Sequence, residues 1–112
     1  MVIIMFDEND NHIKKLTKIM KITCSEKEII ESYLKMVDID IKLFPIGKVS
    51  EMKSEFKNDV FDTIFEDENG VIIDLRLDEV KPTFEEMINY TQYWAELYFK
   101  FNKDVQPYFI MR

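Results

Sequence analysis

The second half of this 112-residue chain concentrates carboxylates in one short segment. Eight acidic residues lie between Asp59 and Glu79, where Arg76 is the one basic residue. Oxygen ligands of this kind suit a divalent cation such as Mg²⁺. Runs of charge more often form a surface that is only solvated. The segment is therefore interpreted in two ways, as a carboxylate cluster for a cation or as a β-hairpin with a charged, solvated outer face.

Four charged side chains of this segment have the spacing to gather on one side of a strand pair. Asp74, Arg76 and Asp78 alternate with leucines along one β-prone run, and Asp62 lies on the run before it. Because side chains alternate across a strand, the first three share a face. If Asp62 faces the same side, the acids would hold Mg²⁺ for phosphodiester cleavage, and the guanidinium would stabilise developing charge.

A predicted β-hairpin must position these residues. Residues 60–65 and 71–77 are rich in β-branched and aromatic side chains, and Asn69-Gly70 lies between them. Asn-Gly is a strong hairpin signal because both residues tolerate positive φ.

A helix and a last strand are expected after the hairpin. Thr83 and Glu86 form a capping box behind Pro82, which predicts a helix that runs to about Phe101. Residues 105–111 have the composition of a strand. A helix that connects two strands in this way is a crossover, which places the last strand parallel to the preceding strand in the same sheet.

Two helices are predicted in the N-terminal half of the chain. Ser25 and Glu28 form another capping box, which predicts a helix over residues 26–37. Before it, apolar residues at helical spacing between lysines predict a short basic amphipathic helix from Ile13 to Lys21.

Two further segments have strand-like patterns. Apolar and polar residues alternate over residues 39–43, which predicts a strand that Pro45 and Gly47 end. Residues 2–6 are β-prone, so that residues 1–11 form either an edge strand or a flexible tail. The predicted fold is a mixed α/β (α+β) domain over residues 1–112, with a small mixed sheet, a central hairpin and flanking helices.

Composition excludes several classes of function. Apolar residues make up 46% of the chain, enough for one core, and two glycines leave no room for a P-loop or a dinucleotide fingerprint. No apolar run approaches the roughly 20 residues of a membrane span, so a cytoplasmic protein without membrane contact is expected. Cys24 and His12, the one cysteine and one histidine, support neither a disulfide nor a zinc site.

The net charge of −7 disfavours a plain nucleic-acid binder, because attraction to phosphate normally drives such binding. The charge is uneven. Residues 11–57 carry +3 and residues 58–112 carry −7. DNA is therefore expected to be a weak partner at most.

The hairpin string from Asp62 through Glu66-Asp67-Glu68-Asn69-Gly70 to Asp78, with its flanking helices and the last strand, resembles the PD-(D/E)XK nuclease superfamily. The most similar branch is the transposase-associated, recombination-promoting nuclease-like group. The resemblance implies a restriction-endonuclease-like core, dependence on Mg²⁺ and DNA endonuclease activity.

The motif of this family is irregular in the chain. Asp62 matches the first motif acid. Aligned through Asn69-Gly70, Arg76 and Asp78 occupy the positions of the central acid and of the Gln or Lys after it, so the central acid is lost. If the alignment is shifted by one strand alternation, which is two residues, Asp74-Leu75-Arg76 becomes a variant D-x-K motif. In this variant Arg replaces Lys, and Arg cannot readily deprotonate as Lys does. The resemblance thus implies Asp62, Asp74 and Arg76 as catalytic residues and Asp62, Asp74 and Asp78 as metal ligands.

A non-enzymatic alternative rests on the aromatic helix. Tyr90, Tyr93, Trp94 and Tyr98 could stack bases, but so many aromatic side chains on one helix favour packing against a sheet and a partner. In this second hypothesis the chain keeps the fold, lacks catalysis and forms a homodimer through that helix.

Overall fold

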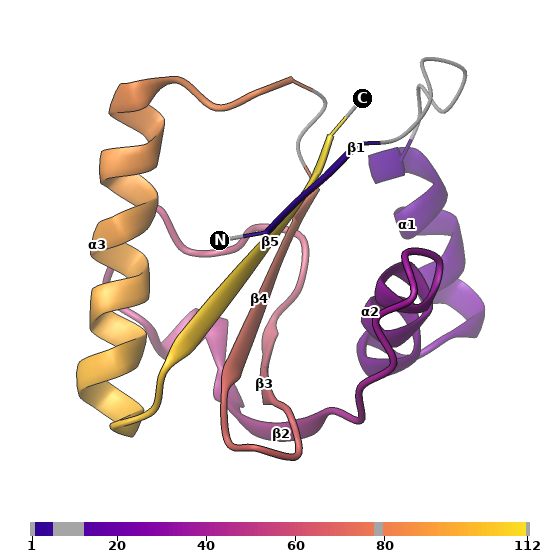
Figure 1. Cartoon of the computed structure of the whole chain (residues 1–112), viewed down its shortest axis with the longest axis horizontal. Coiled ribbons are helices and arrows are strands. Elements are labelled where there is room, and N and C mark those ends of the chain that lie inside the picture. The colour runs from indigo at the N-terminus through magenta and orange to yellow at the C-terminus, as the bar shows by residue number, and fades with distance from the viewer. Residues whose placement is uncertain (1, 6–12, 78–79, 112) are drawn as a thin grey trace.

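The computed structural model describes residues 2–5, 13–77 and 80–111, and it shows a sheet between two helical layers (Figure 1). Helices α1 (Ile13–Thr23) and α2 (Glu26–Lys35) cover one face, and α3 (Phe84–Phe101) covers the other. The predicted mixed α/β class is confirmed. No helix in the described ranges is long and apolar enough to cross a membrane.

The sheet has five strands in the order β1-β5-β4-β3-β2. The strands are β1 (Val2–Met5), β2 (Phe44–Lys48), β3 (Thr63–Glu66), β4 (Ile72–Leu77) and β5 (Val105–Met111). A short 3₁₀ helix, η1 (Val49–Glu51), follows β2. Strands β1, β5 and β4 are parallel, whereas β3 is antiparallel to β4 and to β2. The parallel pairing predicted for the last strand is therefore confirmed.

Helices α2 and α3 begin where their capping boxes predict. The Ser25 and Thr83 hydroxyls accept hydrogen bonds from the backbone N–H groups of Glu28 and Glu86, whose carboxylates return to the cap residues. This satisfies donors that a helix start leaves unpaired. Helix α3 ends at Phe101, and its C-cap residue Asn102 adopts the left-handed conformation with φ of 53°.

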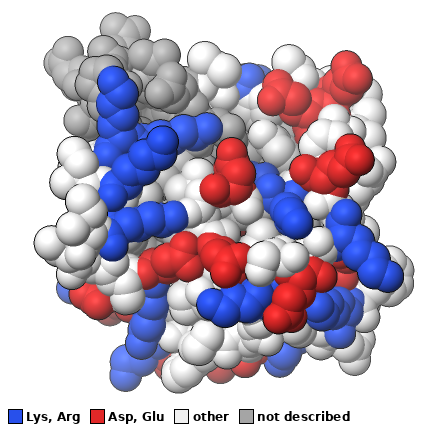
Figure 2. All heavy atoms as spheres, turned by 180° about the vertical axis from the view of Figure 1, so that it is seen from behind, with Lys and Arg blue, Asp and Glu red and all other residues white. Residues whose placement is uncertain are grey.

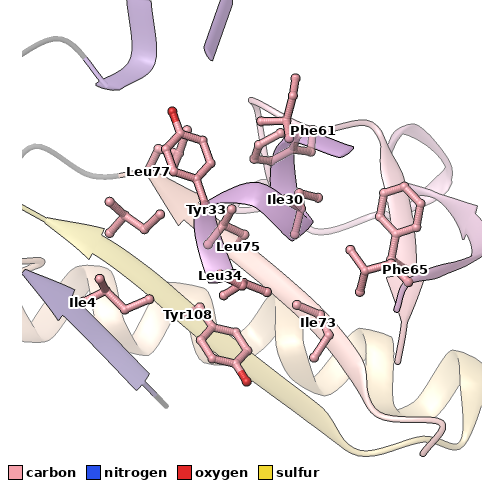
Figure 3. Close-up of a cluster of buried hydrophobic side chains, with 13 residues drawn as sticks. Ile4, Ile30, Tyr33, Leu34, Phe61, Phe65, Ile73, Leu75, Leu77 and Tyr108 are labelled. Atoms are coloured by element: carbon pink, nitrogen blue, oxygen red, sulfur yellow. The ribbon is translucent and has the colours of Figure 1, made fainter. Parts of the chain in front are cut away.

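Two clusters of buried side chains hold the layers together. The larger lies between α2 and the sheet, and Figure 3 shows its side chains meeting there, among them Ile30, Leu34, Phe61, Phe65, Ile73, Leu75 and Leu77. The smaller lies under α3 and consists of Val49, Met52, Ile64, Ile72, Tyr93 and Leu97. Alternation along β4 thus sends Ile73, Leu75 and Leu77 to the α2 side.

The predicted hairpin is β3–β4, although β3 starts three residues later than expected. In its turn, the backbone N–H of Gly70 donates to the carbonyl of Asp67 over 3.0 Å, and the N–H of Asp67 donates to the carbonyl of Val71 over 2.9 Å. Gly70 has φ of +75°, a conformation that L-residues rarely adopt. The neighbouring Asn69 does not have a positive φ.

The strand predicted over residues 39–43 is wrong. Those residues form no strand, and β2 contains both expected breakers, Pro45 and Gly47. An edge strand tolerates proline, and the register shifts between these two residues. Gly47 lies under the ring of Phe101, where a Cβ would approach the ring Cζ to 2.9 Å. The contact with α3 explains why glycine belongs in this strand.

The N-terminal segment includes an edge strand. Residues 2–5 form β1, which pairs with β5, while residues 6–11 of the predicted strand or tail lie outside the described ranges.

Replacing Gly70 tests the turn. We expect Gly70→Ala to lower the free energy of unfolding by about 1 kcal/mol, because alanine is strained at positive φ. Urea unfolding monitored by circular dichroism measures the change. The matched control, Glu68→Ala, alters an exposed residue of the same turn and should change stability by less than about 0.5 kcal/mol. Equal effects of the two substitutions would contradict the assignment.

Candidate functional site

Asp62 lies immediately before β3, and its side chain is half exposed. Its Oδ1 atom accepts a hydrogen bond from the backbone N–H of Ser50 over 3.1 Å. Its Oδ2 atom lies 3.7 Å from the Nζ atom of Lys48. Both oxygens are thus engaged by the segment that includes the end of β2 and η1.

Asp74 lies in the middle of β4 on the side that α3 covers. Its Oδ2 atom accepts hydrogen bonds from Arg76 Nε over 3.0 Å and from Trp94 Nε1 over 2.8 Å. Its Oδ1 atom accepts one from Asn58 Nδ2 over 3.1 Å. A carboxylate has about four acceptor positions, so three donors nearly saturate this one.

Arg76 is the buried counterion of Asp74, since the two residues expose 7% and 5% of their surface. Its Nη2 atom donates to the carbonyl oxygen of Phe56 over 2.9 Å. The guanidinium carbon lies 4.6 Å from the ring centre of Tyr90 and 5.1 Å from that of Tyr93. Ring faces attract cations, so α3 stabilises the charge of Arg76.

Asn58 joins this network to the loop before β3, and it was not predicted as a site residue. Its Nδ2 atom donates to Asp74 and, over 2.7 Å, to the carbonyl of Leu75. Its Oδ1 atom accepts from the backbone N–H groups of Val60 and Phe61 over 2.9 and 3.0 Å. The one local signal is that asparagine often accepts from the backbone two or three residues onward.

The four aromatic residues predicted at an interface have different positions on α3. Tyr93 is buried in the cluster under the helix. Tyr90 and Trp94 are partly buried, with ring centres 5.5 and 6.0 Å from that of Phe109 on β5. Tyr98 is exposed and packs edge-on against Phe99. The first three therefore fill the layer between helix and sheet, and Tyr98 is accessible to a partner.

The charged face of β4 is buried, so the interpretation of a solvated outer face does not hold for Asp74 and Arg76. The predicted alternation itself is correct, since Leu75 and Leu77 face the opposite side. Burial raises the pKa of the neighbouring Tyr93 phenol, and the Asp74 carboxylate raises it further. Tyr93 is therefore neutral at physiological pH, and the charges that meet under α3 are those of Asp74 and Arg76.

The geometry around Asp74 fits a divalent cation poorly. Its oxygens already accept three hydrogen bonds, and the guanidinium of Arg76 would repel a second cation. Among the residues that the structure describes, no three His, Cys, Asp or Glu side chains are grouped to hold a metal ion. Asp78, the third predicted ligand, lies outside the described ranges. The magnesium site stays a prediction.

A surface cleft of about 290 Å³ lies beside the network. The buried Arg76 and Asn58 line it, together with the basic Lys14 and Lys57 and the acidic Glu55 and Asp59. Figure 2 shows lysine side chains gathered on the left, over α1, and acidic side chains at the upper right, towards the start of α3. The mixed charge of the cleft gives no strong preference for an anion or a cation.

Comparison of the chain with protein-family models, with curated proteins and with solved structures finds no match. The resemblance to nucleases therefore rests on the hairpin motif and its flanking helices.

Breaking the buried pair tests its structural role. We expect Arg76→Met to lower the free energy of unfolding by about 3–5 kcal/mol, because the Asp74 charge stays buried without its counterion. Asp74→Leu combined with Arg76→Met should recover part of this loss. Urea unfolding measures all three proteins.

The control is Lys48→Met, which removes the exposed ion pair with Asp62 and should cost less than about 1 kcal/mol. If Arg76→Met costs no more than this control, the buried pair does not stabilise the fold.

Proposed function

We propose that this chain is a non-catalytic interaction module with a nuclease-like core, which self-associates through the outer side of α3. The observation that supports it is the occupied carboxylate of Asp74, which accepts hydrogen bonds from Arg76, Trp94 and Asn58. The nuclease hypothesis requires the same carboxylate to bind Mg²⁺.

Releasing Asp74 for a metal would be costly. The Arg76 guanidinium would lose its counterion while it stayed under α3, and an unpaired buried charge destabilises a fold by about 3–5 kcal/mol. Arg76 is also an unsuitable substitute for a catalytic lysine, because its guanidinium stays protonated. Both motif residues on β4 thus serve the fold better than they would serve catalysis.

The outer side of α3 supplies the surface for a partner. Phe84 and Phe99, near the two ends of the helix, expose 83% and 81% of their surface, and Ile88 and Tyr98 are also exposed. Large aromatic residues on one exposed helix face are typical of protein interfaces. The acidic net charge is compatible with a protein partner and unfavourable for DNA.

Metal titration separates this proposal from a nuclease. We expect Mg²⁺ or Mn²⁺ at 0 to about 10 mM to leave the melting temperature unchanged, and supercoiled DNA to stay intact. A site with a Kd of about 1 mM would instead add about 1.4 kcal/mol, or several degrees. The control is Asp62→Asn. Metal-dependent stabilisation or DNA nicking that this substitution abolishes would overturn the non-catalytic assignment in favour of a Mg²⁺-dependent endonuclease.

Sedimentation velocity tests self-association. The wild-type chain should change from monomer to dimer with rising concentration, and Ala95→Arg, on the outer side of α3, should remain monomeric. The matched control, Ile22→Arg, places the same charge on an exposed apolar position of α1 and should leave the dimer intact. A wild-type chain that stays monomeric at every concentration would contradict the proposal.

A further inference from the structure

The exposed residues of α3 form a continuous stripe. It is defined by five positions, three or four residues apart, which lie on the side of the helix opposite the buried Tyr93 and Leu97. We call it the outer stripe, and it consists of Phe84, Ile88, Thr91, Ala95 and Phe99. Figure 1 shows α3 as the outermost layer on its face of the sheet, so the outer stripe points away from the rest of the fold.

The order of residues in the outer stripe is nearly the same from either end. Phe84 and Phe99 are the outermost members, and Ile88 and Ala95 lie four residues inside them, on either side of a midpoint between Thr91 and Gln92. Two such helices packed antiparallel around this midpoint bring Phe84 of each copy to Phe99 of the other. They likewise bring Ile88 of each copy to Ala95 of the other.

This pairing matches large side chains with small ones at the inner positions. Ile88 would project over Ala95 of the second copy, whose short side chain leaves space for it. Interhelical distances of about 8–10 Å depend on such combinations at the contact. The aromatic residues would close the two ends of the contact.

Helix dipoles favour the antiparallel direction. Each α3 helix has partial positive charge at its start and partial negative charge at its end. Antiparallel packing brings opposite ends of the two helices together, whereas parallel packing brings like ends together.

The other exposed apolar helix face lacks this self-complementarity. Leu16, Ile19 and Ile22 are exposed on α1, but Lys15 and Lys18 are exposed beside them. Two copies joined there would bring lysines against lysines.

We infer that two copies of this chain associate with two-fold symmetry through antiparallel α3 helices, in the register that places Phe84 of one copy against Phe99 of the other. The symmetric contact is closed, so association stops at the dimer. This inference rests on the proposed function for self-association through the outer side of α3, and it adds the direction and the register of the two helices.

Cross-linking tests the register. In a Cys24→Ser background, Phe84→Cys and Phe99→Cys are prepared separately, mixed above the dimerisation constant and treated with a short bismaleimide. We expect a covalent dimer in the mixture and monomers in each separate sample, because the ends of α3 lie about 22 Å apart along one helix. Lys35→Cys, exposed at the end of α2, is the control and should not cross-link.

The outcomes separate the inference from the proposal it builds on. Cross-linking within a separate Phe84→Cys or Phe99→Cys sample indicates parallel helices and overturns the inference. A dimer that is not cross-linked in the mixture of Phe84→Cys and Phe99→Cys also overturns it, while self-association stands. A chain that sediments only as a monomer refutes the self-association itself.

Discussion

The buried pair of Asp74 and Arg76 is the constraint on which the arrangement of the layers depends. Two opposite charges in a nearly dry site need hydrogen bonds from all sides, because desolvation is costly. Those bonds come from three separate segments, namely β4 itself, the loop that contains Phe56 and Asn58, and Trp94 on α3. A shift of α3 along the sheet would remove Trp94 from the carboxylate. The pair therefore specifies where the helix lies as well as contributing to stability.

Because of this buried pair, the inner and outer sides of α3 have different roles. The inner side provides aromatic faces and an indole N–H to the charged residues of β4, together with Leu97 and Tyr93 for the apolar cluster. The outer side is exposed, so its large apolar residues make no comparable contribution to the fold. Phe84 and Phe99 at such positions lower solubility unless another surface covers them. A partner explains them more simply than folding does.

Much of the fold could be predicted because its signals are local. The capping boxes at Ser25 and Thr83 and the turn at Gly70 act within a few residues, and the structure has them where the sequence indicates. Strand β2 could not be predicted, because Gly47 is explained by the ring of Phe101, more than fifty residues away. The role of Asn58 was missed for the same reason, since this loop residue has its partner Asp74 on β4, sixteen residues further along the chain.

The candidate site shows why a motif of this kind is ambiguous before the fold is known. An acid and a base two residues apart on a strand share a face, whether they hold a metal or each other. What covers that face decides between the two outcomes. Here α3 supplies a donor for the acid and aromatic rings for the base, so the pair is satisfied without a metal. The other side of the same helix is exposed to solvent. Because the charged pair of the hairpin is already satisfied, the outer stripe of α3 is the better candidate for a functional surface.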